Sequence, residues 1–356
     1  MITTFRAKNY GCLVDVTAHV TPLHAFIGPN DSGKSTLLHG MRTVVQLASG
    51  KFGTGPDGQW APFPPYLPIR FPHTAEGPVR HDVVLSCGVD GGAYEYEVQS
   101  AGIERVVDGG DERSERRSPT DWSVVLRPAS TVLHQLRAAR LARFDPDALR
   151  APSGLIPETG RVDFLDDRGR GLAGVYFAIR NRNDDAFATI VAGVRKHFPT
   201  IKNLRVKAVT SAEVVLEAEL TTGARVEAAR MSEGLLYYLA FAALRHIDPV
   251  SLLLVEEPEN GLHPARIAEV VRILRAIVED TGTQVILATH SPLVVNELRP
   301  EEVSVVTRYE ATGTQVTRIH ETPDFAERAK VYALGELWIA YANGDDERPL
   351  LTGTEP

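Results

Sequence analysis

A segment with two glycines, a lysine and a serine at fixed spacing, GPNDSGKS at 28 to 35, carries the clearest chemistry in the sequence. It satisfies the pattern G-x-x-x-x-G-K-[ST], in which backbone N–H groups and the lysine surround the phosphates of a nucleotide. We expect Lys34 to neutralise the β and γ phosphates, Ser35 to supply a hydroxyl to Mg²⁺, and Thr36 to bond an α-phosphate oxygen. The alternative is a glycine turn that caps a core helix. The candidate nucleotide-binding residues here are Gly28, Pro29, Asn30, Asp31, Ser32, Gly33, Lys34, Ser35 and Thr36.

Two adjacent carboxylates follow a buried-strand pattern in SLLLVEEPENGLHP at 251 to 264. Neighbouring residues on a strand face opposite ways, so at the strand end one carboxylate can meet Mg²⁺ while the other reaches the attacking water. We therefore assign Glu256 to the metal and Glu257 to the general base. Taken alone, such a pair is more often a solvated loop entrance, and the upstream phosphate loop is what favours catalysis.

A histidine follows another buried strand, in QVILATHSP at 284 to 292. His290, just past the strand end, is predicted to hydrogen-bond the γ-phosphate or to orient the water. Without the other motifs, a packed histidine would be the simpler interpretation. Lys34, Glu257 and His290 are thus the candidate catalytic residues.

A helix start in ARMSEGLLYYLAF at 229 to 241 gives a fourth candidate. Ser232 and Gly234 open the expected helix, and a helix N-terminus can hold an anion such as a phosphate presented by another subunit. The alternative is an ordinary helix cap.

These motifs require elements that hold them at one edge of a sheet. A short strand, Leu23–Ile27, runs into the phosphate loop, and a helix with apolar residues at helical spacing follows it. Later the order becomes helix 233 to 246, strand 251 to 255, helix 264 to 280, strand 284 to 288 and strand 303 to 307. This alternation predicts a parallel α/β half-sheet.

The region between these two parts is predicted to be mixed. Strands are expected at 81 to 89, 93 to 99 and 122 to 126, with 108 to 119 as a mobile tip. Helices are expected at 129 to 150 and 184 to 198, and an antiparallel pair at 205 to 228. No internal repeat or long heptad run is present, so long coiled-coil arms are not expected. We divide the single unit 1 to 356 into parts 1 to 50, 51 to 228, 229 to 320 and 321 to 356.

Composition excludes several classes of protein. Lys plus Arg number 38 against 46 Asp plus Glu, so no overall basic field favours nucleic acid, although a local stripe could exist. Cys12 and Cys87 lack the spacing of a zinc site or a disulfide framework. The start is not typical of a signal peptide, and no segment has the apolar length of a membrane span. We expect a cytoplasmic protein.

The four motifs, in this order, resemble the ABC ATPase superfamily. The run EEPENGLHP with THSP looks most like the stand-alone AAA-21 type, related to the ATPase domain of OLD proteins. The resemblance implies an α/β P-loop NTPase fold: an ABC-type ATPase head with an antiparallel β subdomain and a helical signature lobe. It also implies that GPNDSGKST is Walker A, LLLVEE is Walker B, ENGLH is the D-loop and His290 is the switch histidine. In MSEGL, Ser232 and Gly234 match the family signature, whereas Glu233 and Leu235 depart from it.

The resemblance further implies a homodimer with ATP at the interface, closed by ATP binding and opened by hydrolysis. By analogy, the cycle would act on DNA or gate a separately encoded effector, for instance in genome maintenance or defence. The alternatives are a transporter subunit, which the imperfect signature disfavours, and a nucleotide-controlled scaffold, which the carboxylate pair disfavours. Only 66 residues follow His290, without an acidic cluster, so an OLD-type nuclease is not expected. If nucleic acid binds, the candidate contacts are Arg113, Arg116, Arg117, Arg137, Arg140 and Arg143. Solvated helix and loop faces are the simpler interpretation of both groups of arginines.

Overall fold

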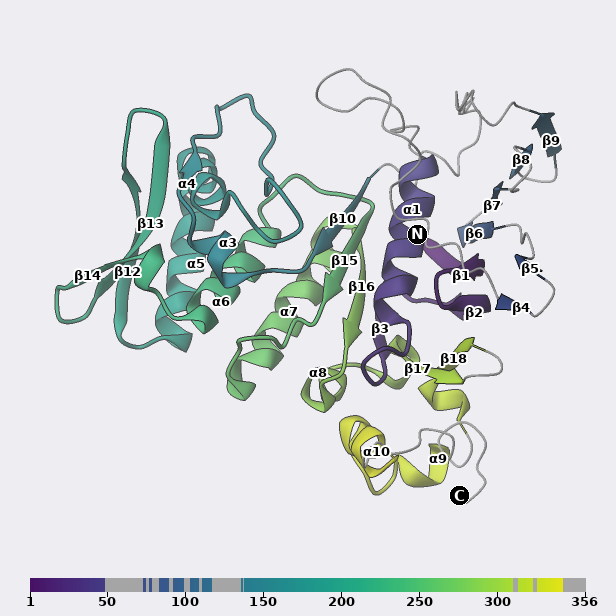
Figure 1. Cartoon of the computed structure of the whole chain (residues 1–356). Helices are drawn as coiled ribbons and strands as arrows, with labels where there is room; N and C mark the ends of the chain where they lie inside the picture. Colours follow the sequence, from purple (N-terminus) through teal and green to yellow (C-terminus); the bar gives the residue numbers. More distant parts are fainter. Residues whose placement is uncertain are drawn as a thin grey trace. The chain divides into compact units, whose positions relative to one another are not determined.

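The chain forms two compact units in the computed structural model (Figure 1). The structure describes residues 1–48, 73–74, 77–78, 83–89, 92–98, 103–108, 111–116, 136, 138–309, 313–322 and 325–341. Unit 1 comprises Met1–Arg140, Val250–Leu254 and Thr283–Pro356. Unit 2 comprises Leu141–Pro249 and Val255–Gly282. The second unit therefore begins and ends inside the sequence of the first.

The central sheet of unit 1 has the strand order β10-β15-β16-β3-β17-β18. β3 (Leu23–Ile27) runs parallel to both of its neighbours, β16 (Gln284–Thr289) and β17 (Val303–Tyr309). Every residue of β3 and β16 is buried, as expected for parallel strands covered on both faces. The edge strand β18 (Gly313–Arg318) pairs antiparallel with β17. β10 (Ala139–Ala142) and β15 (Leu252–Glu256) complete the sheet, and both have their last two residues in unit 2.

A second, antiparallel sheet in unit 1 has the order β2-β1-β6-β7-β8-β9. Its strands are β1 (Ile2–Tyr10), β2 (Leu13–His19), β6 (Val83–Val89), β7 (Gly92–Val98), β8 (Ile103–Asp108) and β9 (Asp111–Arg116). The short strands β4 (His73–Thr74) and β5 (Gly77–Pro78) pair separately. The prediction of a tip at 108 to 119 is wrong for β9, which pairs with β8 although its charged sequence shows no apolar alternation. The strand predicted at 122 to 126 lies outside the described residues.

Helix α1 (Lys34–Ala48) confirms the helix predicted after the phosphate loop and packs against β1, β6 and β16. Its inward face is fully buried and consists of Leu37, Leu38, Met41, Val44 and Val45. Gln284 fastens the first strand of the chain, since its side chain both accepts from the N–H of Ile2 and donates to the carbonyl of Ile2, at 2.8 Å each. Three short helices complete the unit: α8 (Pro292–Asn296), α9 (Phe325–Arg328) and α10 (Leu334–Tyr341), with α10 packed on α8.

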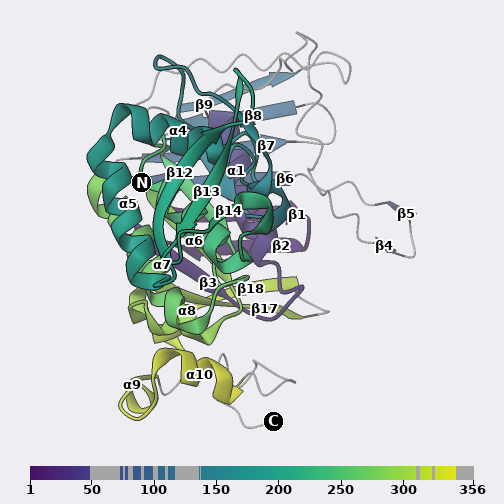
Figure 2. The ribbon, with the colours of Figure 1, turned by 90° about the vertical axis from the view of Figure 1, so that its left-hand side faces the viewer.

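Unit 2 combines helices with a small antiparallel sheet (Figure 2). The sheet pairs β11 (Ser153–Gly154), β12 (Ile201–Ala208) and β14 (Arg225–Glu227) around β13 (Glu213–Leu220). Helix α4 (Leu172–Arg182) packs on β13, and α5 (Asp184–His197) packs on β12. The signature segment forms α6 (Glu233–Leu244), which packs against α7 (Pro264–Thr281). Among the described residues, α7 is the longest helix at 18 residues.

The middle of the chain differs from the prediction in two places. A helix over 129 to 150 is wrong where the structure describes it, because residues 139–142 form β10 and only Pro146–Arg150 form a helix, α3. Asp145 explains this start: its side chain accepts from the N–H groups of Asp147 and Ala148 and caps α3. Helix α4 was not predicted. Within the described ranges, no helix combines the length and apolarity that a membrane crossing requires.

Candidate functional site

The phosphate loop lies between the end of β3 and the start of α1, as the motif requires. Glycine is needed at both ends of this loop. A Cβ on Gly28 would collide with the carbonyl oxygen of Val306, and Gly33 has φ +107° with Thr314 Oγ1 only 2.6 Å from its Cβ position. Asp31 adopts φ +66°, which completes a tight turn. The loop backbone therefore lies directly against its neighbours.

Lys34 is 93% withdrawn from solvent, with a relative exposure of 7%. Its Nζ donates to the carbonyl oxygens of Gly28 and Pro29 at 2.8 and 2.6 Å. The ammonium group is thus folded back onto the loop that the motif assigns to phosphate. The cation therefore lies at the loop that the motif assigns to the phosphates, and its role in binding them stays a prediction.

The back of the loop is held by residues that the sequence motifs did not identify. Thr314 of β18 donates through Oγ1 to the carbonyl of Ser32 at 2.9 Å. Cys12 donates through Sγ to Thr36 Oγ1 at 3.4 Å and accepts from Thr314 at 3.5 Å. Arg308 of β17 donates to the carboxylate of Asp31 at 2.8 Å. No sequence signal could find these partners, because they are distant in the chain and belong to no motif.

One polar atom in the loop fits a further ligand. Ser32 is 1% exposed, and its Oγ has no hydrogen-bond partner among the described residues. A buried hydroxyl without a partner is costly, so a phosphate oxygen at this loop would satisfy it. Ser35, the predicted metal ligand, is exposed at the start of α1.

His290 lies at the same sheet edge as the phosphate loop. In the parallel pairing of β16 with β3, Thr289 is the register partner of Ile27, so His290 and Gly28 both follow directly after the paired positions. The side chain of Thr289 accepts from the N–H of Ser291, which shapes the turn that carries the exposed His290. Unit 1 therefore brings Lys34 and His290 to one edge, as the sequence predicted.

The predicted carboxylate pair, Glu256 and Glu257, belongs to unit 2. The side chain of Glu256 is 4% exposed and lies 3.4 Å from Arg143 Nε, measured from Oε2. Glu257 has φ +48°, an uncommon value for a residue with a Cβ, and accepts from Asn260 Nδ2 at 2.5 Å. This strained backbone separates the two neighbours: Glu256 is buried and Glu257 is half-buried at the turn. Backbone strain of this kind concentrates at functional sites.

The signature segment also lies in unit 2, where Ser232 is the N-cap of α6. Its side chain makes no capping hydrogen bond and is exposed, so its hydroxyl is available. The D-loop packs against this helix, since the carbonyl of Gly261 lies 3.1 Å from the Cβ position of Gly234. Gly261 itself has φ +67°, and a Cβ there would collide with the ring of Tyr237. Signature and D-loop are therefore packed backbone to backbone.

A metal held at these residues would rely on few protein ligands. In the described part of the chain, no group of three or more His, Cys, Asp or Glu side chains is placed to bind a metal ion. Mg²⁺ bound with a nucleotide does not need such a cage, because it keeps waters and uses phosphate oxygens with one or two side chains. The exposed hydroxyl of Ser35 in unit 1 and the buried carboxylate of Glu256 in unit 2 are each an oxygen ligand of the type that Mg²⁺ accepts.

The predicted nucleic-acid contacts remain predictions. The side chains of Arg113 and Arg116 in β9 are not described, and Arg117 and Arg137 lie outside the described residues. Arg143 is directed to Glu256.

Cys12 and Cys87 are free thiols, and burial raises the pKa of the Cys87 thiol to about 12.

A phosphate loop between a strand and a helix, at the carboxyl edge of parallel strands, defines a P-loop nucleotide-binding fold. The family described as "AAA domain, putative AbiEii toxin, Type IV TA system" matches residues 105–296, more than half of the chain. The chain belongs to this family, the AAA-21 type of P-loop ATPase that the sequence motifs predicted. The match begins after the phosphate loop, so the loop itself is independent support for the assignment. No curated protein gives a significant match.

Solved structures with a similar fold are heads of SMC proteins. The SMC head bound to the C-winged helix domain of ScpA has a TM-score of 0.57 at 14% identity, covering 89% of this chain and 97% of that one. The head from Thermotoga maritima has a TM-score of 0.48 at 15% identity, with 89% and 98% covered. A head from Pyrococcus furiosus has a TM-score of 0.47 at 11% identity, with 89% and 95% covered. The first of these confirms the predicted fold class, an ABC-type ATPase head, and at this identity it shows the fold alone.

Proposed function

We propose that this protein is a Mg²⁺-dependent ATPase that binds ATP at Gly28–Thr36. The observation that carries the proposal is the phosphate loop: two positions without room for a side chain, and Lys34 turned onto the loop carbonyls. The partnerless hydroxyl of Ser32 supports it, because this loop has an unused donor where phosphate oxygens would lie.

The proposed division of labour follows the chemistry of each side chain. Lys34 neutralises the β and γ phosphates, and the N–H groups of the loop and of α1 bind their oxygens. Glu257 accepts the proton of the attacking water, and His290 hydrogen-bonds the γ-phosphate or orients that water. Mg²⁺, held by Ser35 and Glu256, supplies charge neutralisation at the phosphates.

The proposed assembly is a homodimer with ATP at the interface. Its support is the exposed N-terminus of α6, where Ser232 makes no cap and, with Gly234, could receive a phosphate from a partner subunit. The wider role that we propose is to drive or gate a nucleic-acid-related or defence effector. This direction is supported by analogy from the family description, which refers to a toxin of a toxin–antitoxin system, and from the SMC head with a TM-score of 0.57, which was solved bound to a domain of ScpA.

Steady-state ATP hydrolysis tests the proposal, with wild type compared with Glu257→Gln and Lys34→Met. Glu257→Gln should lower kcat by about 10²–10⁴-fold, the usual contribution of a general base, while nucleotide still binds. Lys34→Met should abolish binding, because it removes the cation and keeps the apolar stem. Size measurement of Glu257→Gln with ATP should give a dimer, and double-stranded DNA should stimulate the wild type if the effector pathway involves DNA.

Unchanged turnover in Glu257→Gln would remove the catalytic assignment. If wild type binds ATP but does not hydrolyse it, the scaffold alternative is correct instead. Failure of wild type to bind any nucleoside triphosphate would overturn the proposed function as a whole.

A further inference from the structure

The carboxylate of Glu256 already faces a cation from its own chain. Arg143 Nε lies 3.4 Å from Glu256 Oε2, and the two side chains differ sharply in exposure, at 72% and 4%. Removing a carboxylate from water is unfavourable unless a positive charge compensates it. Arg143 supplies that charge from the solvent side, where its guanidinium group remains largely hydrated.

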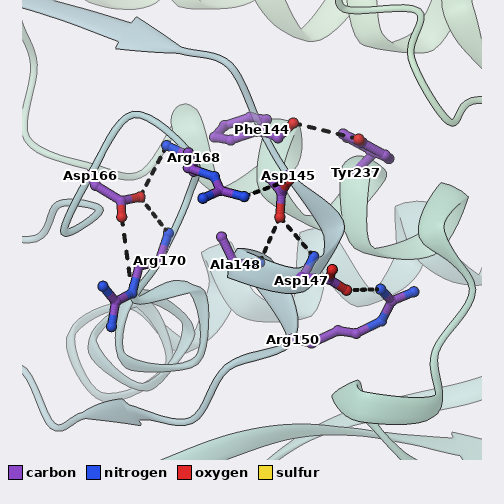
Figure 3. Close-up of polar contacts among 9 residues, drawn as sticks. All are labelled: Phe144, Asp145, Asp147, Ala148, Arg150, Asp166, Arg168, Arg170 and Tyr237. Atoms are coloured by element: carbon purple, nitrogen blue, oxygen red, sulfur yellow. Dashed lines mark hydrogen bonds and ion pairs between the residues drawn. The ribbon is translucent and has the colours of Figure 1, made fainter.

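The backbone at Arg143 is held by hydrogen bonds, and Figure 3 shows the contact between Tyr237 and its neighbour Phe144. The N–H groups of Arg143 and Asp145 donate to the carbonyls of Asp167 and Arg168, at 2.8 and 3.0 Å. Between them, the carbonyl of Phe144 accepts from the hydroxyl of Tyr237 at 3.5 Å. The side chain of Arg143 can therefore leave Glu256 without any movement of the chain that carries it.

An ion pair between Asp145 and Arg168, at 2.9 Å, further stabilises the backbone segment that carries Arg143. The hydrogen bond from Arg168 is the main reason why the pKa of Asp145 is lowered, with the cap of α3 contributing. The carboxylate of Asp166 accepts from the N–H groups of Arg168 and Arg170 and folds the neighbouring turn. The surrounding arginines are thus engaged with aspartates, whereas Arg143 is directed to the buried glutamate.

We propose that Arg143 is a resident counter-ion of Glu256 that competes with the divalent cation and so sets the Mg²⁺ concentration at which the site loads. The proposal rests on the proposed function, because it takes Glu256 as a metal ligand. Arg143 is a positioning residue here: its guanidinium group holds the Glu256 carboxylate in place from the solvent side. Both cations are attracted by the same carboxylate group, so each lowers the occupancy of the other.

Metal binding, measured separately from hydrolysis, tests this inference. Mn²⁺ is titrated into the full chain with a non-hydrolysable ATP analogue, and free Mn²⁺ is followed by its paramagnetic resonance signal. Arg143→Ala and Arg143→Gln should lower the half-saturating Mn²⁺ concentration about three- to tenfold, as expected for a half-exposed ion pair. Arg170→Ala is the matched control, since Arg170 is similarly exposed and pairs with Asp166 at 4.0 Å, and it should leave the titration unchanged.

The controls separate this inference from the proposed function. Binding of a fluorescent ATP analogue is measured first, both in EDTA and with Mg²⁺, and failure of wild type to bind under both conditions would overturn both. If the analogue binds, unchanged or weaker Mn²⁺ binding in both Arg143 variants overturns the counter-ion alone. An equal effect of Arg170→Ala would also overturn it, because a general change in surface charge would then explain the result.

Discussion

Thr314 Oγ1 donates to the carbonyl oxygen of Ser32 at 2.9 Å, across 282 positions of sequence. Both residues are almost completely buried, at 1% exposure each. The same hydroxyl lies 2.6 Å from the position that a Cβ on Gly33 would occupy. A single side chain of the edge strand β18 therefore supports the phosphate loop and restricts the residue that can stand at its second glycine.

Replacing Thr314 should lower the free energy of unfolding, because it removes a hydrogen bond to the phosphate loop. Thr314→Val keeps the shape but leaves the buried carbonyl of Ser32 without this donor, which should cost about 1–3 kcal/mol of unfolding free energy. Thr314→Ser keeps the hydroxyl and should cost less. Urea unfolding of both variants measures the difference, and equal stability of the two would show that the hydrogen bond is not what stabilises the loop.

Comparing alanine variants of Gly33 and Gly223 distinguishes the cost of a left-handed backbone from the cost of a steric collision. Gly33 has φ +107° and Gly223 has φ +84°, but nothing lies within 4 Å of the Cβ position of Gly223. Gly223→Ala should therefore lose only about 1 kcal/mol, from the left-handed backbone. Gly33→Ala should lose a further 1–3 kcal/mol or so from overpacking against Thr314 and Cys12, and should also weaken ATP binding. Thermal unfolding of both variants checks the order, and equal losses would argue against the collision.

We expect Glu257 to lower the stability of the fold while its side chain serves hydrolysis. Because its φ is +48°, a residue that tolerates the left-handed region should suit this backbone better. Glu257→Asn and Glu257→Gln both remove the proposed base, so both should lower kcat by about 10²–10⁴-fold. We expect Glu257→Asn to be the more stable of the two by about 0.5–1 kcal/mol in urea unfolding. A more stable Gln variant would mean that the contact with Asn260 outweighs the strain.

His24 should make the protein sensitive to mild acid. It is fully buried in β3, where its Nε2 lies 3.0 Å from Ser304 Oγ, and burial, with a smaller effect of the charge of Arg318, lowers its pKa from 6.5 to about 3. A neutral histidine in the folded state destabilises that state once the unfolded chain can take up the proton. Its contribution to stability is therefore constant above pH 6.5 and falls as the pH drops from 6.5 towards 3.

Urea unfolding at pH 7 and pH 5 measures this effect against His24→Gln, which cannot titrate. Between these two pH values, wild type should lose about 2 kcal/mol more than the variant. Equal losses in the two proteins would show that His24 is protonated, or exposed, in the folded state.

The spacing of apolar residues predicted the strand and helix on either side of the phosphate loop, because that spacing follows directly from which face each element buries. The strand Leu23–Ile27 and helix α1 are apolar on the faces that they bury, and their bounds follow from the glycines between them. Asp145 and Pro146 could have corrected the helix expected at 129 to 150, because an N-cap followed by proline marks a helix start. β9 could not be predicted from its residues, since DERSER forms a strand only through pairing with β8.

The sequence likewise predicted one part of the candidate site and could not predict another. Motif spacing predicted Lys34 and His290 at one sheet edge, because parallel strands place their carboxyl ends together. It could not predict Arg143 beside Glu256, because that pairing depends on how residues 113 positions apart in sequence fold within unit 2. From the sequence alone, Arg143 is either an arginine on a solvated face or, if nucleic acid binds, a candidate contact for it.

The position of β3 in the sheet affects how the protein can fold during its synthesis on the ribosome. Residues 23 to 27 are buried, yet they pair with residues 285 to 289 of β16 and residues 303 to 305 of β17. At synthesis rates of roughly 5–20 residues per second, the strand that leads into the phosphate loop leaves the ribosome tens of seconds before either neighbour exists. During that interval an apolar segment has no sheet to join, so the nascent chain should depend on chaperones, and nucleotide binding can arise only near the end of translation.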